Sequence, residues 1–177
     1  VALGLLVALA RFSEAFLVLR AADRGLPLAW VPVVLVVMSA VYALTAYPAG
    51  YLSDRMSRST LLALGMGVLV LADVALAASD GLGLVFGGIA LWGLHMGLTQ
   101  GILASLVADV VPEAYRGTAF GMFNLVSGAG LLVASAVAGW LWDRQGPPAA
   151  FWMGAVVSGL AALATPWLAR AMKPSSA

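Results

Sequence analysis

Residues 31–60 read VPVVLVVMSAVYALTAYPAGYLSDRMSRST. The long apolar part carries no charged side chain, and the charges Asp54, Arg55 and Arg58 follow it directly. A run of about 20 apolar residues is long enough to cross a bilayer as one helix. The two prolines inside the run are compatible with a membrane helix, because neighbouring groups satisfy the carbonyls that a proline frees. We therefore expect a membrane-spanning helix over about residues 28–52 that ends in a charged turn.

The composition of the whole chain also indicates a membrane environment. Hydrophobic residues make up 63% of the 177 residues and charged residues only 10%, whereas soluble domains use roughly 45–50% apolar residues. At roughly 20 residues per crossing, the chain has room for six or seven helices and for no soluble domain beside them.

Polar breaks divide the chain into six apolar segments. Turns with Gly, Pro, Asp or Arg separate them, and such residues end helices. We predict an all-α membrane protein with a six-helix transmembrane part at 1–170 and a polar C-terminal tail at 171–177. The predicted spans cover about residues 1–21, 28–52, 60–78, 82–107, 117–141 and 149–169.

The loop charges predict an orientation, because cytoplasmic loops carry an excess of Lys and Arg. Arg11 is left out of the count because it lies within a span. One side then holds Arg55, Arg58, Arg116, Arg170 and Lys173, which is five, and the other holds Arg20, Arg24 and Arg144, which is three. The five-residue side is predicted to be cytoplasmic, which places both ends of the chain in the cytoplasm.

Several function classes find no support in the sequence. Without cysteine there is no disulfide or thiolate metal site, and we expect no metal and no cofactor. A net charge of +1 without basic clusters argues against nucleic acid as a partner. The sequence has one histidine and no phosphate-binding glycine loop, so it offers no recognisable set of catalytic residues.

Ionisable residues inside the predicted spans are the first candidates for a functional site. Insertion of a charged residue at the centre of a membrane helix costs roughly 2.5–3.5 kcal/mol, so such residues usually serve a function. Arg11 and Glu14 are three residues apart and are expected to pair on one helix face. This pair either binds a polar solute, with Glu14 as a carrier of a coupling proton, or is a structural salt bridge. Asp73, on span three, is expected to pair structurally.

Polar residues on the later spans are further candidates. His95, near the middle of span four, is either a proton relay or solute contact or a hydrogen-bonded packing group. Gln100 follows on the same span, and Asn124 on span five offers a neutral hydrogen-bonding group.

Glycines recur at intervals of four on spans four and five, for example Gly93 with Gly97 and Gly117 with Gly121. Small residues let membrane helices approach closely. These glycines therefore indicate helix packing, and the alternative interpretation makes the two spans moving surfaces.

Two loop motifs resemble those of the major facilitator superfamily. In the loop after span two, Gly50, Asp54, Arg55 and Arg58 match the signature Gly, three or four residues, then Asp-Arg-x-Gly-Arg. The chain departs from this signature at Ser57, where the family usually has glycine. The glycine is expected to allow close helix approach and Asp54 to form a conformational latch by pairing with a base or capping a helix.

The loop after span four carries the second motif, in which the family often has Asp-x-x-Pro-x-x-x-Arg-Gly. The residues that match it are Asp109, Pro112, Arg116 and Gly117. Together the motifs make the chain equivalent to helices 7–12 of that family.

The resemblance implies secondary active transport of a small solute by alternating access, proton-coupled and directed towards efflux. It also implies a bacterial inner membrane, lipid contacts and an N-terminal six-helix half as partner, which the start at Val1 within an apolar run suggests is missing. The alternative is a channel-like or scaffold protein whose six helices act as a homodimer.

Overall fold

The computed structural model describes residues 2–109 and 111–171, and all regular structure there is helical. Two single-turn 3-10 helices, Leu28–Trp30 and Glu113–Tyr115, precede α3 and α6. The α-helices are α1 (Ala2–Leu9), α2 (Ala15–Asp23), α3 (Val31–Ser53), α4 (Arg58–Ala77), α5 (Leu82–Asp109), α6 (Arg116–Gln145) and α7 (Pro147–Ala171).

Five of these helices, α3 to α7, are long and apolar enough to cross a membrane. Their lengths run from 20 residues in α4 to 30 in α6, and about 20 residues at about 1.5 Å each span the hydrocarbon layer. The prediction of an all-α membrane protein is confirmed. The sixth spanning helix is not confirmed.

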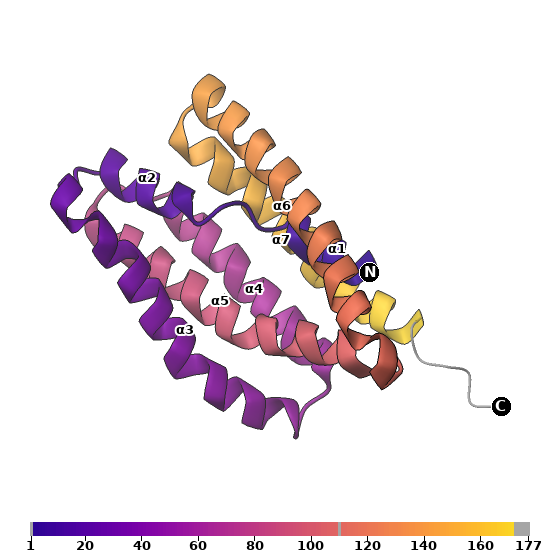
Figure 1. The fold of residues 1–177 in the computed structure, drawn as a ribbon. Helices are drawn as coiled ribbons and strands as arrows, with labels where there is room; N and C mark the ends of the chain where they lie inside the picture. Colours follow the sequence, from indigo (N-terminus) through magenta and orange to yellow (C-terminus); the bar gives the residue numbers. More distant parts are fainter. Residues whose placement is uncertain (1, 110, 172–177) are drawn as a thin grey trace.

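The prediction of one continuous helix over residues 1–21 is wrong, because the structure divides this segment into α1 and α2 (Figure 1). The segment between them turns Phe12 into the core, where its ring lies 5.2–5.4 Å from the rings of Phe16, Trp92 and Phe151. The backbone N–H of Ser13 donates to the Ser135 hydroxyl of α6 at 3.0 Å. Aromatic packing and a bond to a neighbouring helix therefore replace the helical hydrogen bonds of this stretch.

The turns follow from local residues. Ser57 caps α4 by accepting a hydrogen bond from the Thr60 backbone N–H at 3.2 Å. Its φ of −64° is ordinary for any residue, so the glycine usual in the family is not needed at this position. Gly146, with φ of +91°, ends α6 in a conformation that favours glycine. Pro147 then begins α7, where its missing N–H costs nothing.

Helix α4 lies at the centre of the bundle. It packs along α5 on one side and along α7 on the other, α3 packs against α5, and α1 packs against α6. In the most apolar window of each helix, half of the residues of α4 and of α5 are buried, compared with 11% in α3 and in α6. The core therefore runs along α4, α5 and α7, and α3 and α6 form outer faces.

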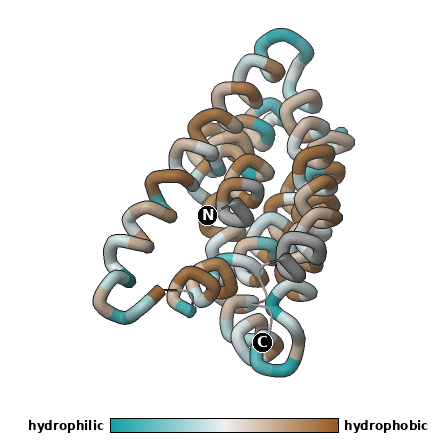
Figure 2. Tube along the Cα trace, turned by 90° about the vertical axis from the view of Figure 1, so that its right-hand side faces the viewer, coloured by the Kyte–Doolittle hydropathy of each residue, from teal (hydrophilic) through white to brown (hydrophobic). Residues whose placement is uncertain are grey.

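Polar contacts identify the two ends of the bundle. Arg58, at the start of α4, pairs with Asp109, at the end of α5, so the α3–α4 and α5–α6 connections share one end. At the other end, Arg20 of α2 bonds the carbonyls that end α4. Figure 2 shows hydrophilic residues gathered at the turns and hydrophobic ones along the helices between them.

Candidate functional site

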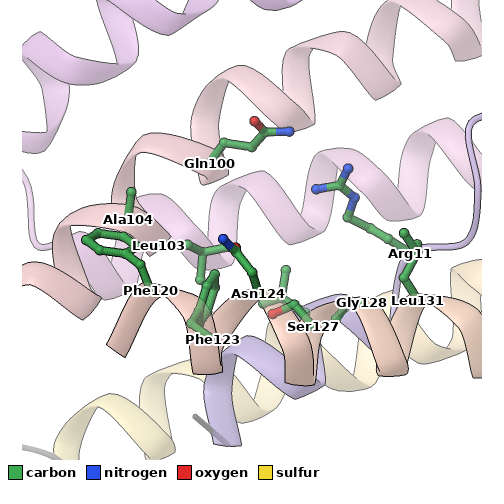
Figure 3. Close-up of a pocket in the computed structure, with 12 residues that line it drawn as sticks. Arg11, Gln100, Leu103, Ala104, Phe120, Phe123, Asn124, Ser127, Gly128 and Leu131 are labelled. Atoms are coloured by element: carbon green, nitrogen blue, oxygen red, sulfur yellow. The ribbon is translucent and has the colours of Figure 1, made fainter. Parts of the chain in front are cut away.

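A cavity of about 480 Å³ opens between α1, the α1–α2 linker, α5 and α6. Polar and aromatic side chains from three of these elements point into it (Figure 3). The polar lining residues are Arg11, Gln100, Asn124 and Ser127, and two aromatic ones are Phe120 and Phe123. A space with one cation, neutral polar groups and aromatic walls suits a small amphipathic solute.

Arg11 enters the cavity from the linker rather than from a regular helix. Its Nη2 lies 3.8 Å from Glu14 Oε1, with side-chain exposures of 19% and 38%. The guanidinium Nε is buried and has no hydrogen-bond partner among the described residues. Glu14 itself does not line the cavity. The pair is therefore loose, and the Arg11 guanidinium has donors left for a ligand.

Gln100 and Asn124 reach the cavity from two different helices. Gln100 lies on α5 and Asn124 on α6, and both amides face the same space as Arg11 (Figure 3). An amide supplies both donors and acceptors, so each suits a solute of mixed polarity. The structure thus brings together three of the five predicted solute or proton residues.

His95 lies elsewhere in the bundle. It is fully buried and is absent from the cavity lining. Its Nδ1 lies 2.8 Å from the carbonyl oxygen of Gly65 on α4, and its own carbonyl accepts a bond from Thr99. These contacts are those of a group that joins α5 to α4.

The aromatic wall was missed by sequence reasoning. Phe120 and Phe123 lie on α6 on the same face as Asn124 and Ser127. Positions 120, 123, 124 and 127 follow the helical spacing of three and four residues. That spacing, taken with the two polar members, was a signal from which the wall could have been found.

An ion pair joins the α3–α4 loop to the α5–α6 loop. Arg58 pairs with Asp109, a member of the second motif, and so joins the two loops. The Arg55 guanidinium lies 4.4 Å from the ring centre of Tyr51. Asp54 forms no ion pair within the described chain, and a Cβ on Gly50 would meet open space. A close helix approach at Gly50 is therefore not found.

The other members of the second motif are exposed. Arg116 Nη1 lies 3.9 Å from Glu113 Oε1 in a solvent-facing pair. Pro112 precedes the short helix before α6, and Gly117 meets nothing within 4 Å. Asp109 is the one member of the motif that contacts the first loop in the described structure.

Arg20 makes a structural contact that the sequence did not reveal. The residue was counted as a loop cation, yet its side chain is 0% exposed. It donates to the carbonyls of Leu76, Ala77 and Ser79 at 2.9–3.1 Å and pairs with Asp23 at 2.8 Å. A cation at a helix C-terminus also interacts favourably with the helix dipole. Arg20 therefore fastens α2 to the end of α4.

Comparisons with known proteins agree with this architecture. The family model of the Major Facilitator Superfamily matches residues 1–177. An uncharacterized MFS-type transporter of Methanocaldococcus jannaschii is 33% identical over 165 residues, which cover 86% of this chain and 40% of that protein. An uncharacterized protein of Mycobacterium tuberculosis is 36% identical over 115 residues, or 65% of this chain and 28% of that protein.

A second Mycobacterium tuberculosis protein, an uncharacterized MFS-type transporter, is 32% identical over 130 residues, or 71% of this chain and 19% of its own length. In each of these matches, less than half of the relative is covered by this chain.

Proposed function

Because this chain belongs to the Major Facilitator Superfamily, a family of secondary transporters, we propose that it forms one wall of a solute pathway that works by alternating access. The observation that carries the proposal is the interrupted helix at the cavity. Irregular backbone at membrane depth is tolerated where it lines a cavity, and the α1–α2 linker presents Arg11 there.

The proposed solute is small and amphipathic, with an anionic or acceptor group. Arg11 binds that group, Gln100 and Asn124 supply directional hydrogen bonds, and Phe120 and Phe123 contact the apolar part. The single formal charge among the described lining residues is positive, so an anion is favoured over a cation.

Proton coupling is proposed to depend on Glu14. A solute anion at Arg11 competes with the Glu14 carboxylate, which already lies at 3.8 Å. Arg11 can therefore pair either with the solute or with Glu14, but not fully with both. Solute binding at Arg11 and the state of Glu14 are thereby linked, as proton-coupled transport requires. His95 is assigned to helix packing because it bonds α4 and does not reach the cavity.

The two loops are proposed to form the conformational switch. Arg58 and Asp109 hold the ends of α4 and α5 together in this conformation, and separation of the pair would accompany the change of access. The setting proposed is a bacterial inner membrane with both chain ends cytoplasmic, and the opposite wall of the cavity belongs to an N-terminal six-helix half.

The test uses the full-length protein in proteoliposomes that contain a pH-sensitive dye. A panel of aromatic carboxylates, neutral sugars and organic cations is supplied, and proton flux and solute exchange are recorded. We expect aromatic carboxylates to be transported, and Glu14→Gln to abolish gradient-driven flux while solute exchange survives. Asp143→Asn, which removes a carboxylate from an exposed position near the end of α6, should leave both unchanged.

Arg11→Gln tests the binding role separately. We expect it to abolish both exchange and driven flux of carboxylates, whereas Arg144→Gln, on an exposed side chain at the end of α6, should not. If Glu14→Gln keeps driven flux, the Arg11–Glu14 pair is structural. If current flows without saturation, the channel alternative holds instead.

A further inference from the structure

Asp73 is a buried acid that the proposed solute pathway does not use. It lies within α4, is 0% exposed, and does not line the cavity. Its place on span three predicts a structural partner, and the described residues provide none. Neither carboxyl oxygen has a hydrogen-bond partner among them.

The carboxyl lies against α7 and the α1–α2 linker. A Cβ added to Gly154 would lie 2.8 Å from Asp73 Oδ2 and 2.8 Å from Phe12 Cε1. The α7 backbone at Gly154 and the Phe12 ring therefore cover the carboxyl from two sides. Any side chain larger than the glycine hydrogen at position 154 would clash with the carboxyl and the Phe12 ring.

Ser158 is the hydroxyl next to this contact on α7. Its hydroxyl donates to the Ala155 carbonyl at 3.2 Å rather than to Asp73. The carboxyl oxygens thus remain without a partner in the described structure. A buried carboxylate in this position would be a charge without compensation.

The charged groups on the surrounding helices are engaged elsewhere. On α5, His95 bonds a backbone carbonyl of α4 through Nδ1. On α2, Arg20 bonds the carbonyls at the end of α4 and pairs with Asp23. Residues 147–165 of α7 include no ionisable side chain, and α3 carries tyrosines alone. In the linker, the charges are Arg11, which lines the solute cavity, and Glu14, which lies 3.8 Å from Arg11.

We propose that Asp73 is a proton-binding site separate from the solute cavity. It holds a proton while α4 and α7 are packed at Gly154 and exchanges it with water during local openings of this contact. On release, the carboxylic O–H bond breaks, the proton passes to water and the carboxylate remains. On closure, a proton from the aqueous phase restores the neutral acid. Any use of this proton in transport rests on the proposed function, whereas the protonated state of Asp73 does not.

The first test is infrared difference spectroscopy of the full-length protein in lipid, with aspartate carboxyls labelled with carbon-13. At neutral pH we expect a protonated aspartic acid band that Asp73→Asn removes. Asp80→Asn, at an exposed turn position, and Glu14→Gln should leave it in place. Asp73→Asn should also fold as well as the wild type, because the amide mimics the neutral acid. A spectrum with no protonated aspartic acid band, or with one unaffected by Asp73→Asn, overturns the proposal.

The second test follows transfer of the protein into deuterated buffer. We expect the band to shift over time and to do so several-fold faster in Gly154→Ala, which separates the carboxyl from α7. Gly159→Ala is the matched control, because its Cβ would meet only Val70 Cγ2 at an ordinary 3.9 Å. A band that never exchanges overturns the release step. If no panel solute is transported but the band behaves as expected, the proposed function fails and the proton site stands.

Discussion

One glycine pair on α5 and one on α6 have the same spacing but opposite surroundings. On α5, a Cβ at Gly93 would meet the carbonyl oxygen of Met38, and one at Gly97 would meet Thr45, both on α3. On α6, Gly117 and Gly121 meet nothing within 4 Å. An interval of four residues therefore does not distinguish a packed face from an open one.

The two pairs differ in what they allow. Gly93 and Gly97 lie in the α3–α5 contact, where the packing interpretation holds, whereas Gly117 and Gly121 lie on the open part of α6. A close-packed interface resists sliding because its atoms already touch. The surface of α6 at Gly117 and Gly121 has no such restraint within the described chain.

The largest expected effect comes from Arg20→Met, which removes the contacts between α2 and the end of α4. Three backbone carbonyls and Asp23 lose their donor, and we expect a loss of about 3 kcal/mol or more in the free energy of unfolding. Thermal unfolding in detergent measures it. Arg24→Met is the control, since Arg24 has one looser pair at 3.6 Å. Equal losses in both variants would contradict the clamp.

Gly93→Ala should have the second-largest effect. The new methyl group meets backbone atoms of α3, which do not move aside as a flexible side chain would. Overpacking of this kind costs about 1–3 kcal/mol. Gly101→Ala, on the same helix and facing open space, is expected to leave the unfolding midpoint unchanged or slightly raised. A stable Gly93→Ala variant would show that α3 and α5 are not in close contact.

Reversal of the Arg58–Asp109 pair tests the link between the two loops. The side chains are 40% and 55% exposed, so Arg58→Asp alone should cost about 0.2–1 kcal/mol. The double exchange Arg58→Asp with Asp109→Arg should recover most of that loss in a double-mutant cycle. Reversal of the exposed Arg116–Glu113 pair provides the comparison. Additive losses would mean that the loops are not coupled.

The smallest expected effect is that of Gly121→Ala on α6. Its Cβ enters open space in this chain, so the change in unfolding free energy should stay within about 0.5 kcal/mol. The measurement belongs on the full-length protein. A loss as large as that of Gly93→Ala would show that another surface covers this face and would remove the contrast between the two helices.

Prediction from sequence succeeded where a property belongs to one segment. Charged turns marked the ends of α3 and α5. Failure came where a residue's role depends on a distant partner. Arg20 was taken for a loop cation because nothing near it in the chain reveals the carbonyls that bury it. The roles of the cavity residues and the domain division stay predictions.

Hydrophobicity and turn residues by themselves determined that this is a helical membrane protein, because backbone groups in lipid must find their hydrogen bonds within each segment. Only the tertiary structure decided which glycines touch a neighbour, where the first span breaks, and which polar side chains share a cavity. Those outcomes depend on how each helix is rotated and on which helix lies beside it. Such contacts join residues far apart in the chain, so local sequence does not predict them.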